Sequence, residues 1–155
     1  MMFTGDLRKR NFTGQDLTGA KFRAADLYQA CFEGARLEGA AFAGCFVAEA
    51  RFENASCKSL QAAGSNFYRC NFQSADLTGA LFWDCVLAGA DFRRATLQRI
   101  TLTLDCNTFE EIRLCRAESA KLAYLFGRAR SVHRDGWMEL IGKRDAAWLE
   151  RLFKR

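Results

Sequence analysis

The stretch Ala75-Asp76-Leu77-Thr78-Gly79, followed by Ala80-Leu81-Phe82-Trp83-Asp84, carries a pattern that repeats every five residues. Leu77 and Phe82 are the centres of these two repeats. Stepping by five from Leu77 in both directions reaches a nonpolar residue at every position from Leu7 to Leu102. A small residue usually stands two places before each centre, Asp or Asn often stands one place before it, and Gly often stands two places after it. The chain is therefore a repeat array over about two thirds of its length.

The odd period predicts a coil with corners. Side chains alternate between the two faces of an extended chain, so a centre and the residue two places before it point the same way. Because five is odd, a corner must follow each centre to turn the next centre back inward, and Gly suits such a corner. Taking every fourth repeat gives ladders of similar residues, one of which holds Phe12, Phe32, Phe52, Phe72 and Phe92. A coil with three sides would mix Leu and Phe in every ladder, so we expect four sides.

We name each side after the first centre of its ladder: the Leu7, Phe12, Leu17 and Phe22 sides. A side consists of its centres and the two residues that flank each centre and point outward. The Leu and Phe ladders are expected to fill the interior of the coil.

The Ala-Asp-Leu-x-Gly form of residues 75–79 resembles the pentapeptide-repeat family. The resemblance implies an all-β solenoid, a right-handed four-sided β-helix of about five coils over residues 1–105. It also implies that the interior holds no active-site cavity. The best-known activity in this family is binding to DNA gyrase and protecting it from quinolones or related toxins, by imitating the shape and charge of duplex DNA.

A DNA mimic needs an acidic surface, because the groove that it enters is built for phosphates. In this chain the acids Glu33, Glu53 and Asp91 are interrupted by arginines such as Arg51 and Arg93, and the formal net charge is +5. Gyrase binding is therefore an alternative that the charge disfavours.

Residues 106–155 predict a second segment of different character. The period becomes helical after Cys106, and an apolar stripe containing Trp137, Trp148 and Leu152 predicts an amphipathic helix. This segment has eleven Lys and Arg against seven Asp and Glu, whereas residues 1–105 have twelve against eleven. We expect a C-terminal helical cap or dimerisation segment. A further alternative is that its basic residues bind an anionic membrane or nucleic acid; these residues are Lys143, Arg144, Arg151, Lys154 and Arg155.

The outward residues distinguish the four sides. On the Phe12 and Leu17 sides they are mostly polar, whereas the two remaining sides, which are adjacent, carry an apolar surface that is uncommon unless something covers it. The interface candidates there are Phe46, Tyr68, Leu81, Trp83 and Val86. Three occupants are possible: the chain's own C-terminal segment with Trp137, Trp148 and Leu152, a second copy of the chain, or a foreign protein.

Catalysis and metal binding find little support in the sequence. The single His133 lies at a predicted helix junction, where a solvated or capping role is expected, and Cys106, Cys115 and His133 have no recognisable zinc-ligand spacing. Most of the seven cysteines occupy inward positions, which favours reduced, structural thiols and a cytoplasmic protein. No signal peptide and no apolar run long enough to span a membrane is evident.

Two irregularities lead to local predictions. Leu60 stands at an inward position that is small in other repeats, whereas the centre that follows it is only Ala62. This predicts an exchange of side-chain volume on one side of one coil, with a small bulge as the alternative. Met1, Met2 and Phe3 are expected to form an apolar lid over the first coil. The sequence thus predicts a non-enzymatic protein–protein interaction module with an unidentified protein partner, no cofactor and no small-molecule substrate.

Overall fold

The structure, a computed structural model, describes residues 1–102 of the 155. The expected helical segment 106–155 lies outside the described residues. With it lie the predicted interface residues Trp137, Trp148 and Leu152, the basic residues at the end of the chain, and His133. Within residues 1–102, no helix has the length and apolar character needed to cross a membrane.

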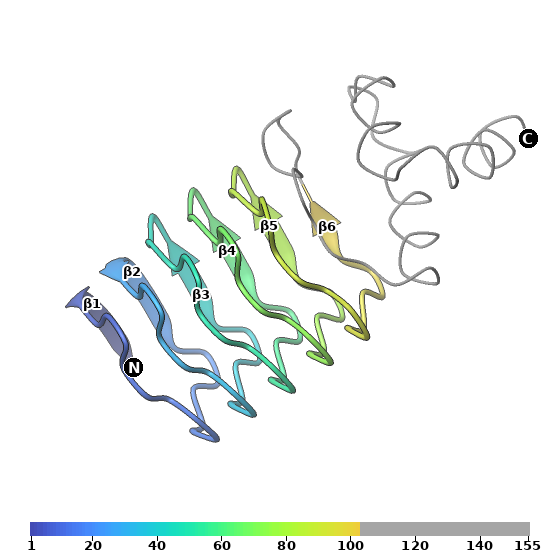
Figure 1. Cartoon of the computed structure of the whole chain (residues 1–155), viewed down its shortest axis with the longest axis horizontal. Coiled ribbons are helices and arrows are strands. Elements are labelled where there is room, and N and C mark those ends of the chain that lie inside the picture. The colour runs from blue at the N-terminus through green and yellow to red at the C-terminus, as the bar shows by residue number, and fades with distance from the viewer. Residues whose placement is uncertain (103–155) are drawn as a thin grey trace, which may run out of the picture.

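Six parallel strands lie side by side in chain order along one side of the molecule (Figure 1). They are β1 (Met2–Asp6), β2 (Lys21–Asp26), β3 (Ala41–Ala43), β4 (Gln61–Ala63), β5 (Leu81–Trp83) and β6 (Thr101–Leu102). From β2 onward, each strand pairs with the residues twenty places further along the chain, so that Phe22 lies beside Phe42 and Ala62 beside Phe82. One coil therefore contains twenty residues, as the ladders of the sequence predicted.

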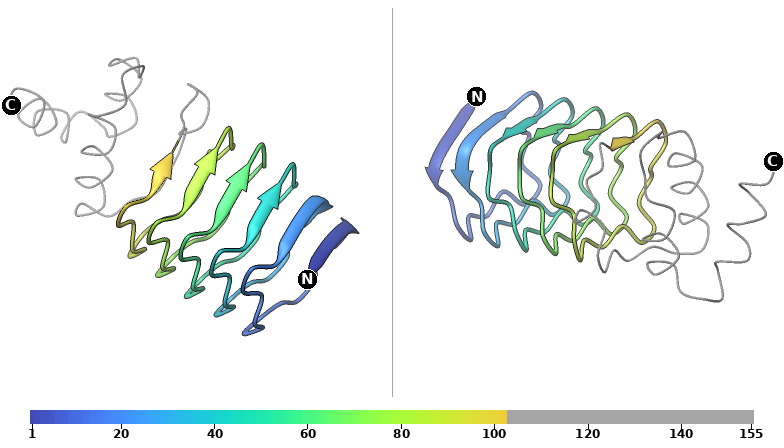
Figure 2. Two further views of the ribbon diagram at one scale, coloured as in Figure 1. Left: turned by 180° about the vertical axis from the view of Figure 1, so that it is seen from behind. Right: turned by 90° about the horizontal axis from the view of Figure 1, so that it is seen from above.

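The other three sides are held by single parallel bridges with the same spacing. Asn11 pairs with Cys31, Asp16 with Arg36, and Asp26 with Phe46, and each pairing recurs in later coils. The two further views in Figure 2 show the coils stacked as successive loops. The fold is a parallel β-solenoid of about five coils, and its four ladders of bridges confirm the four sides predicted from the sequence.

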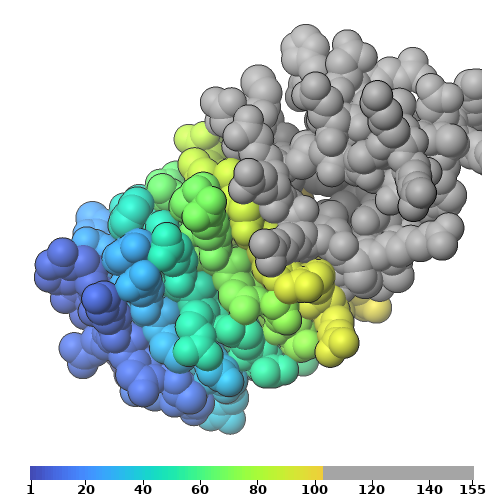
Figure 3. Space-filling model, in the orientation of Figure 1, coloured from blue at the N-terminus to red at the C-terminus, as the bar shows by residue number. Residues whose placement is uncertain are grey.

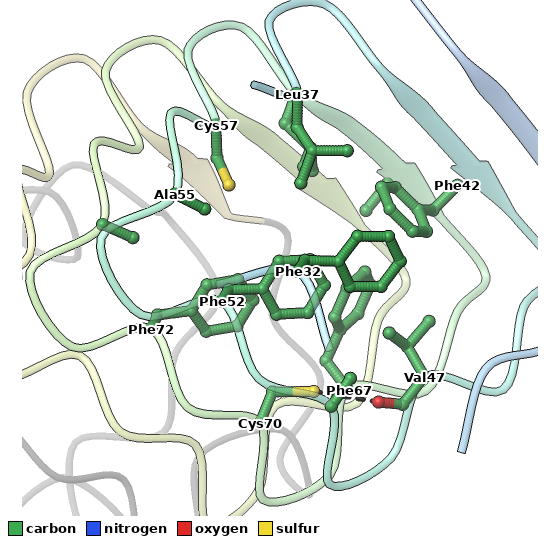
Figure 4. Close-up of a cluster of buried hydrophobic side chains, with 14 of the residues drawn as sticks. Phe32, Leu37, Phe42, Val47, Phe52, Ala55, Cys57, Phe67, Cys70 and Phe72 are labelled. Carbon is green, nitrogen blue, oxygen red and sulfur yellow. Dashed lines mark hydrogen bonds between the residues drawn. The ribbon is translucent and has the colours of Figure 1, made fainter. Parts of the chain in front are cut away.

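The interior is a continuous column of apolar side chains. All five rings of the Phe12 ladder are buried, and consecutive rings stack with centroids 4.7–5.1 Å apart. These separations match the spacing of paired strands, so each ring rests on the ring one coil below. Figure 4 shows Phe32, Phe52 and Phe72 lying in one row. The predicted core ladder is confirmed.

Every corner lies where the sequence predicted it. Each residue two places after a centre, from Lys9 to Arg99 in steps of five, has a positive φ. Gly is common at these positions, but eleven non-glycine residues, including Ala24 and Glu49, adopt the same conformation. The repeat therefore imposes the left-handed corner even where the residue does not favour it.

The Asp and Asn residues one place before the centres stabilise the corners by local hydrogen bonds. In each case the side-chain Oδ1 atom accepts a hydrogen bond from the backbone N–H two residues later. The eight residues that do so are Asp6, Asn11, Asp16, Asp26, Asn66, Asn71, Asp76 and Asp91. Local hydrogen bonding, the expected explanation for this column, is confirmed.

The predicted lid over the first coil is present in part, through Phe3. A shift of register between Phe3 and Gly5 lets Phe3 pair with Phe22, and the two rings stack with centroids 4.7 Å apart. Phe3 is therefore the first member of the Phe22 ladder. Its ring also lies 5.7 Å from that of Phe12, so Phe3 covers apolar side chains of the first coil, whereas Met1 and Met2 are exposed.

The irregular repeat at Leu60 and Ala62 contains no bulge. The register of β4 with β3 and with β5 is unbroken, and both Leu60 and Ala62 are buried. The predicted exchange of volume is present, but it has a second contributor. The ring of Phe67, from the Leu7 side of the same coil, lies 5.8 Å from Phe42 and 5.4 Å from Phe82, the rings one coil below and one coil above Ala62.

Candidate interaction surface

The Phe12 side is polar, and its charged side chains pair with one another. Arg51 forms ion pairs with Glu33 at 2.7 Å and Glu53 at 3.3 Å, and Arg93 pairs with Asp91 at 2.6 Å. The amides of Asn71 and Gln73 join these groups, donating hydrogen bonds to Glu53 and Asp91. This side therefore presents few charges to a partner that are not already matched within the chain.

The Leu17 side follows the same principle. Arg36 pairs with Asp16, and Lys58 lies 3.5 Å from Asp76. The hydroxyl of Ser56 donates a hydrogen bond to Glu38. Exposed ion pairs of this kind add little to stability, but they neutralise the surface on which they lie.

Three carboxylates on the polar sides, those of Asp91, Asp76 and Glu38, have a pKa below the ordinary value. Burial opposes ionisation of Asp91, yet hydrogen bonds from the side chain and backbone of Arg93 and from Gln73 outweigh it, so the pKa of Asp91 lies below its ordinary value. The pKa of Asp76 is lowered in the same way, because hydrogen bonds from Thr78 and the nearby Lys58 outweigh burial. A hydrogen bond from Ser56 lowers the pKa of Glu38.

The Phe22 side is built from β2 to β6, and its outward residues form two columns. Along the solenoid axis one column reads Lys21, Ala41, Gln61 and Leu81, and the other reads Arg23, Ala43, Ala63 and Trp83. Trp83 is 60% exposed, and no outward residue of this side, within the described residues, is acidic. Lys21 and Arg23 thus lie toward the N-terminal end and Leu81 and Trp83 three coils further on, with three alanines and Gln61 between them.

The Leu7 side carries aromatic residues among polar ones. Phe46 and Val86 are 45% and 40% exposed and lie in one column, two coils apart, with Asn66 between them. The ring of Tyr28 lies 6.1 Å from that of Phe46, and its hydroxyl donates a hydrogen bond to Glu49. That hydrogen bond raises the pKa of Tyr28, so the phenol stays protonated.

Two of the predicted interface residues lie on either side of the corner between the Phe22 and Leu7 sides. Trp83 ends β5, and Val86 begins the Leu7 side of the same coil only three residues later. Leu81 and Tyr68 are half-buried on the same two sides, and the guanidinium of Arg69 lies 5.0 Å from the centre of the Tyr68 ring. The five interface candidates within residues 1–102 thus lie on two adjacent sides, Leu81 and Trp83 on the Phe22 side and the other three on the Leu7 side.

Sequence reasoning left Lys21 and Arg23 out of the candidate surface. They precede Leu81 and Trp83 by sixty residues, or three coils, and so belong to the same columns. Counting back from Leu81 and Trp83 in steps of twenty would have found them. In space the coils form successive bands from the N-terminal end, as Figure 3 shows for one face of the molecule.

The cysteines of the described part are free thiols. Burial raises the pKa of Cys57 and Cys70 far above the ordinary value, and it also raises the pKa of Cys45 and Cys85. Thiols of this kind are inert. Within residues 1–102, no group of three or more His, Cys, Asp or Glu side chains is placed to hold a metal ion.

Comparison with solved structures finds several pentapeptide repeat proteins at low identity. One from the thylakoid lumen of Arabidopsis thaliana is 24% identical, with 78% of this chain and 76% of that chain covered and a TM-score of 0.38. QnrB1, a plasmid-mediated fluoroquinolone resistance protein, is 15% identical, with 84% and 99% covered and a TM-score of 0.35. Rfr23 from the cyanobacterium Cyanothece 51142 is 19% identical, with 74% and 81% covered and a TM-score of 0.28.

A comparison with curated proteins found no match. The family model described as pentapeptide repeats does match, in eight copies over residues 6–39, 30–67 and 65–103. These ranges together cover more than half of the chain, and they coincide with the coils of the solenoid. The chain therefore belongs to the pentapeptide-repeat family.

Proposed function

We propose that this chain is a non-enzymatic scaffold that binds a protein partner through the Phe22 and Leu7 sides. The observation that supports the proposal is the contrast between the sides. The Phe12 and Leu17 sides match their own charges, whereas Trp83, Phe46 and Val86 expose apolar area on two adjacent sides. Exposed apolar area of this kind is typical of interaction sites.

The solenoid suits such a role because it is already ordered. Each coil is hydrogen-bonded to its neighbours on all four sides, and the interior is filled by stacked rings. A partner that docks on it orders little of the chain, so less conformational entropy opposes binding. We place this scaffold in the cytoplasm, a reducing compartment that suits its free, buried thiols.

DNA mimicry fits this surface poorly. The acids of the Phe12 side are engaged by Arg51 and Arg93, and the two apolar sides offer no row of carboxylates. We therefore propose a protein partner that recognises apolar and aromatic groups rather than a nucleic-acid groove. A supercoiling assay in which the protein leaves gyrase activity unchanged would agree with this choice.

The test uses the full chain as bait in a native lysate, beside variants that place a charge on each apolar side. Phe46 and Trp83 are both exposed, so Phe46→Glu and Trp83→Glu should leave the fold intact. Each variant should capture less protein than the unchanged chain does. The matched control is Gln98→Glu on the Leu17 side, which should capture as much as the unchanged chain. Equal capture of the same proteins by all four baits would refute the proposal.

A further inference from the structure

We infer that the Phe22 side is the interface of a twofold-symmetric homodimer in which Arg23 of each copy covers Trp83 of the other. This inference rests on the proposed function only in that it assigns one of the two proposed binding sides to a second copy. It follows from the order of residues in the two outward columns.

The columns have opposite character at their two ends. Register partners place Arg23, Ala43, Ala63 and Trp83 in line, and Lys21, Ala41, Gln61 and Leu81 beside them. Arg23 and Lys21 are exposed, and neither forms an ion pair with a residue of the described part. Lys21 and Arg23 therefore have no acidic partner within residues 1–102.

A twofold axis parallel to the strands, passing between the levels of β3 and β4, reverses the order of the coils and keeps the strand direction. It places β2 opposite β5 of the second copy and β3 opposite β4. Arg23 then faces Trp83 of the second copy, and Lys21 faces Leu81. Every contact occurs twice, as a twofold interface requires.

The facing groups are chemically matched. A guanidinium over an indole is a favourable cation–π pair, and the pair strengthens when it is shielded from water. The aliphatic stem of Lys21 can cover Leu81 while its ammonium group stays in solvent. Ala43 and Ala63 are short, so they let the two sheets approach and leave room for the indole and guanidinium to lie across the interface.

Charge selects this arrangement over the alternatives. If the coils of two copies ran in the same order, their strands would run in opposite directions, and Arg23 of each copy would meet Lys21 of the other. The reversed order separates the two basic ends by three coils, about 14 Å, which exceeds the screening length of physiological salt. The chain's own C-terminal segment is a poorer occupant of the basic end, because residues 106–155 carry eleven Lys and Arg against seven Asp and Glu.

The dimer would leave the Leu7 side of each copy open. Phe46 and Val86 lie on that side, so a foreign protein with two binding sites could engage both copies at once. Two linked sites raise the apparent affinity without any new contact. The homodimer is therefore compatible with a scaffold that binds partners through the remaining apolar side.

The test is a complementary exchange of charge in the full chain, read as solution mass by light scattering and sedimentation equilibrium. The unchanged chain should dimerise. R23E removes the cation from both indoles, and W83K places a lysine opposite Arg23, so each variant alone should self-associate at least about tenfold more weakly. An equimolar mixture should recover the dimer, because the new glutamate faces the new lysine while the other Arg–Trp pair remains. Circular dichroism should show both variants folded, since both positions are exposed.

Three results would overturn the inference: a monomeric unchanged chain at every concentration, variants that dimerise as well as the unchanged chain, or a mixture that does not recover the dimer. Dimerisation through residues 103–155 would give the second result. None of them bears on partner binding through the Leu7 side, which is read from the proteins captured by the Phe46→Glu bait. If Phe46→Glu captures less protein from the lysate but has the same solution mass as the unchanged chain, partner binding on the Leu7 side is supported independently of the dimer.

Discussion

The backbone N–H of Cys45 donates a hydrogen bond of 3.0 Å to the hydroxyl of Ser65, one coil further along. The same hydroxyl lies 3.1 Å from the carbonyl oxygen of Ala63 and 3.3 Å from that of Phe42, to either of which it can donate. Ser65 is only 2% exposed, so no bulk water competes for these bonds. A buried hydroxyl in the inward column thus supplies a partner to a backbone group at the corner after the Phe22 side.

Ser65→Ala should lower the free energy of unfolding by about 1 to 3 kcal/mol, because it leaves the buried N–H of Cys45 without its acceptor. Urea denaturation followed by circular dichroism measures the loss. Ser65→Cys is the matched control, since Cys85 and Cys45 occupy the same inward column, and a thiol can accept weakly. We expect the Cys variant to lose less than the Ala variant, and equal stability of Ser65→Ala and the unchanged chain would contradict this account.

The coil geometry was predictable from the sequence because one constraint acts at every repeat. An odd period forces a corner after each centre, and the uniform ladders that begin at Phe12 and Leu7 identify the number of sides. The eight Asp and Asn side chains could be assigned to turns for the same reason, since each acts within its own repeat. The outward placement of Trp83 and Phe46 also followed from counting.

What the sequence could not reveal depends on features that the five-residue pattern does not encode. The shift at Phe3 arises from pairing with β2, and nothing in the five-residue pattern indicates it. The basic pair Lys21 and Arg23 becomes part of a surface only when three coils are stacked on it. The role of Phe67 beside Ala62 likewise requires knowing how far a ring reaches across the interior.

Phe67 and Ala62 should be energetically coupled. Ala62→Phe alone would force a second ring into space that Phe67 already occupies, and overpacking of this kind costs about 1 to 3 kcal/mol. Phe67→Leu alone would leave a cavity beside Ala62 and should also destabilise the fold. The double variant restores the ladders seen in the other coils, with Phe on the Phe22 side and Leu on the Leu7 side.

A double-mutant cycle measured by urea denaturation checks this coupling. The double variant should be more stable than the sum of the two single losses predicts, by about 0.5 to 3 kcal/mol. As a control, Phe67→Leu can be combined with Leu17→Ala, a buried position in the first coil that is distant from the pair. That second pair should be additive, and additivity at Ala62 and Phe67 as well would refute the proposed compensation.

Gly89 lies at a corner where the side chain of Arg69, one coil below, leaves no room for a Cβ atom. Its φ is +69°, and a Cβ atom added there would lie 2.8 Å from the Cγ atom of Arg69. Gly39 has a φ of +62° and no atom within 4 Å of such a Cβ. Both substitutions to Ala incur the cost of a left-handed residue, about 1 to 2 kcal/mol, but only Gly89→Ala must also displace Arg69.

We therefore expect Gly89→Ala to lower the melting temperature more than Gly39→Ala does. Adding Arg69→Ala should remove the difference between the two glycine variants, because the obstructing side chain is then absent. Differential scanning calorimetry gives all of these values on the full chain. If Gly39→Ala proves at least as damaging as Gly89→Ala, the contact with Arg69 has no energetic role at this corner.

The buried thiols should make the fold sensitive to alkali. Burial raises the pKa of Cys70, whose Sγ atom lies 3.1 Å from the carbonyl oxygen of Val47 (Figure 4), and it raises the pKa of Cys57 as well. An unfolded cysteine loses its proton near pH 8.5, whereas these folded thiols keep theirs to much higher pH. Their full stabilisation is therefore present below about pH 8.5, and it declines as the pH rises through the range between the unfolded and folded pKa values.

Each such thiol should reduce the free energy of unfolding by about 1.4 kcal/mol for every pH unit above that point. Cys70→Ala removes one of them, so its stability should fall less steeply with pH than that of the unchanged chain, although it is less stable at pH 7 because it loses side-chain volume. Urea denaturation between pH 7.5 and 10, with a reductant present, measures both slopes. Lysine and tyrosine residues titrate equally in the two proteins, so parallel slopes would show that Cys70 does not remain protonated in the folded solenoid.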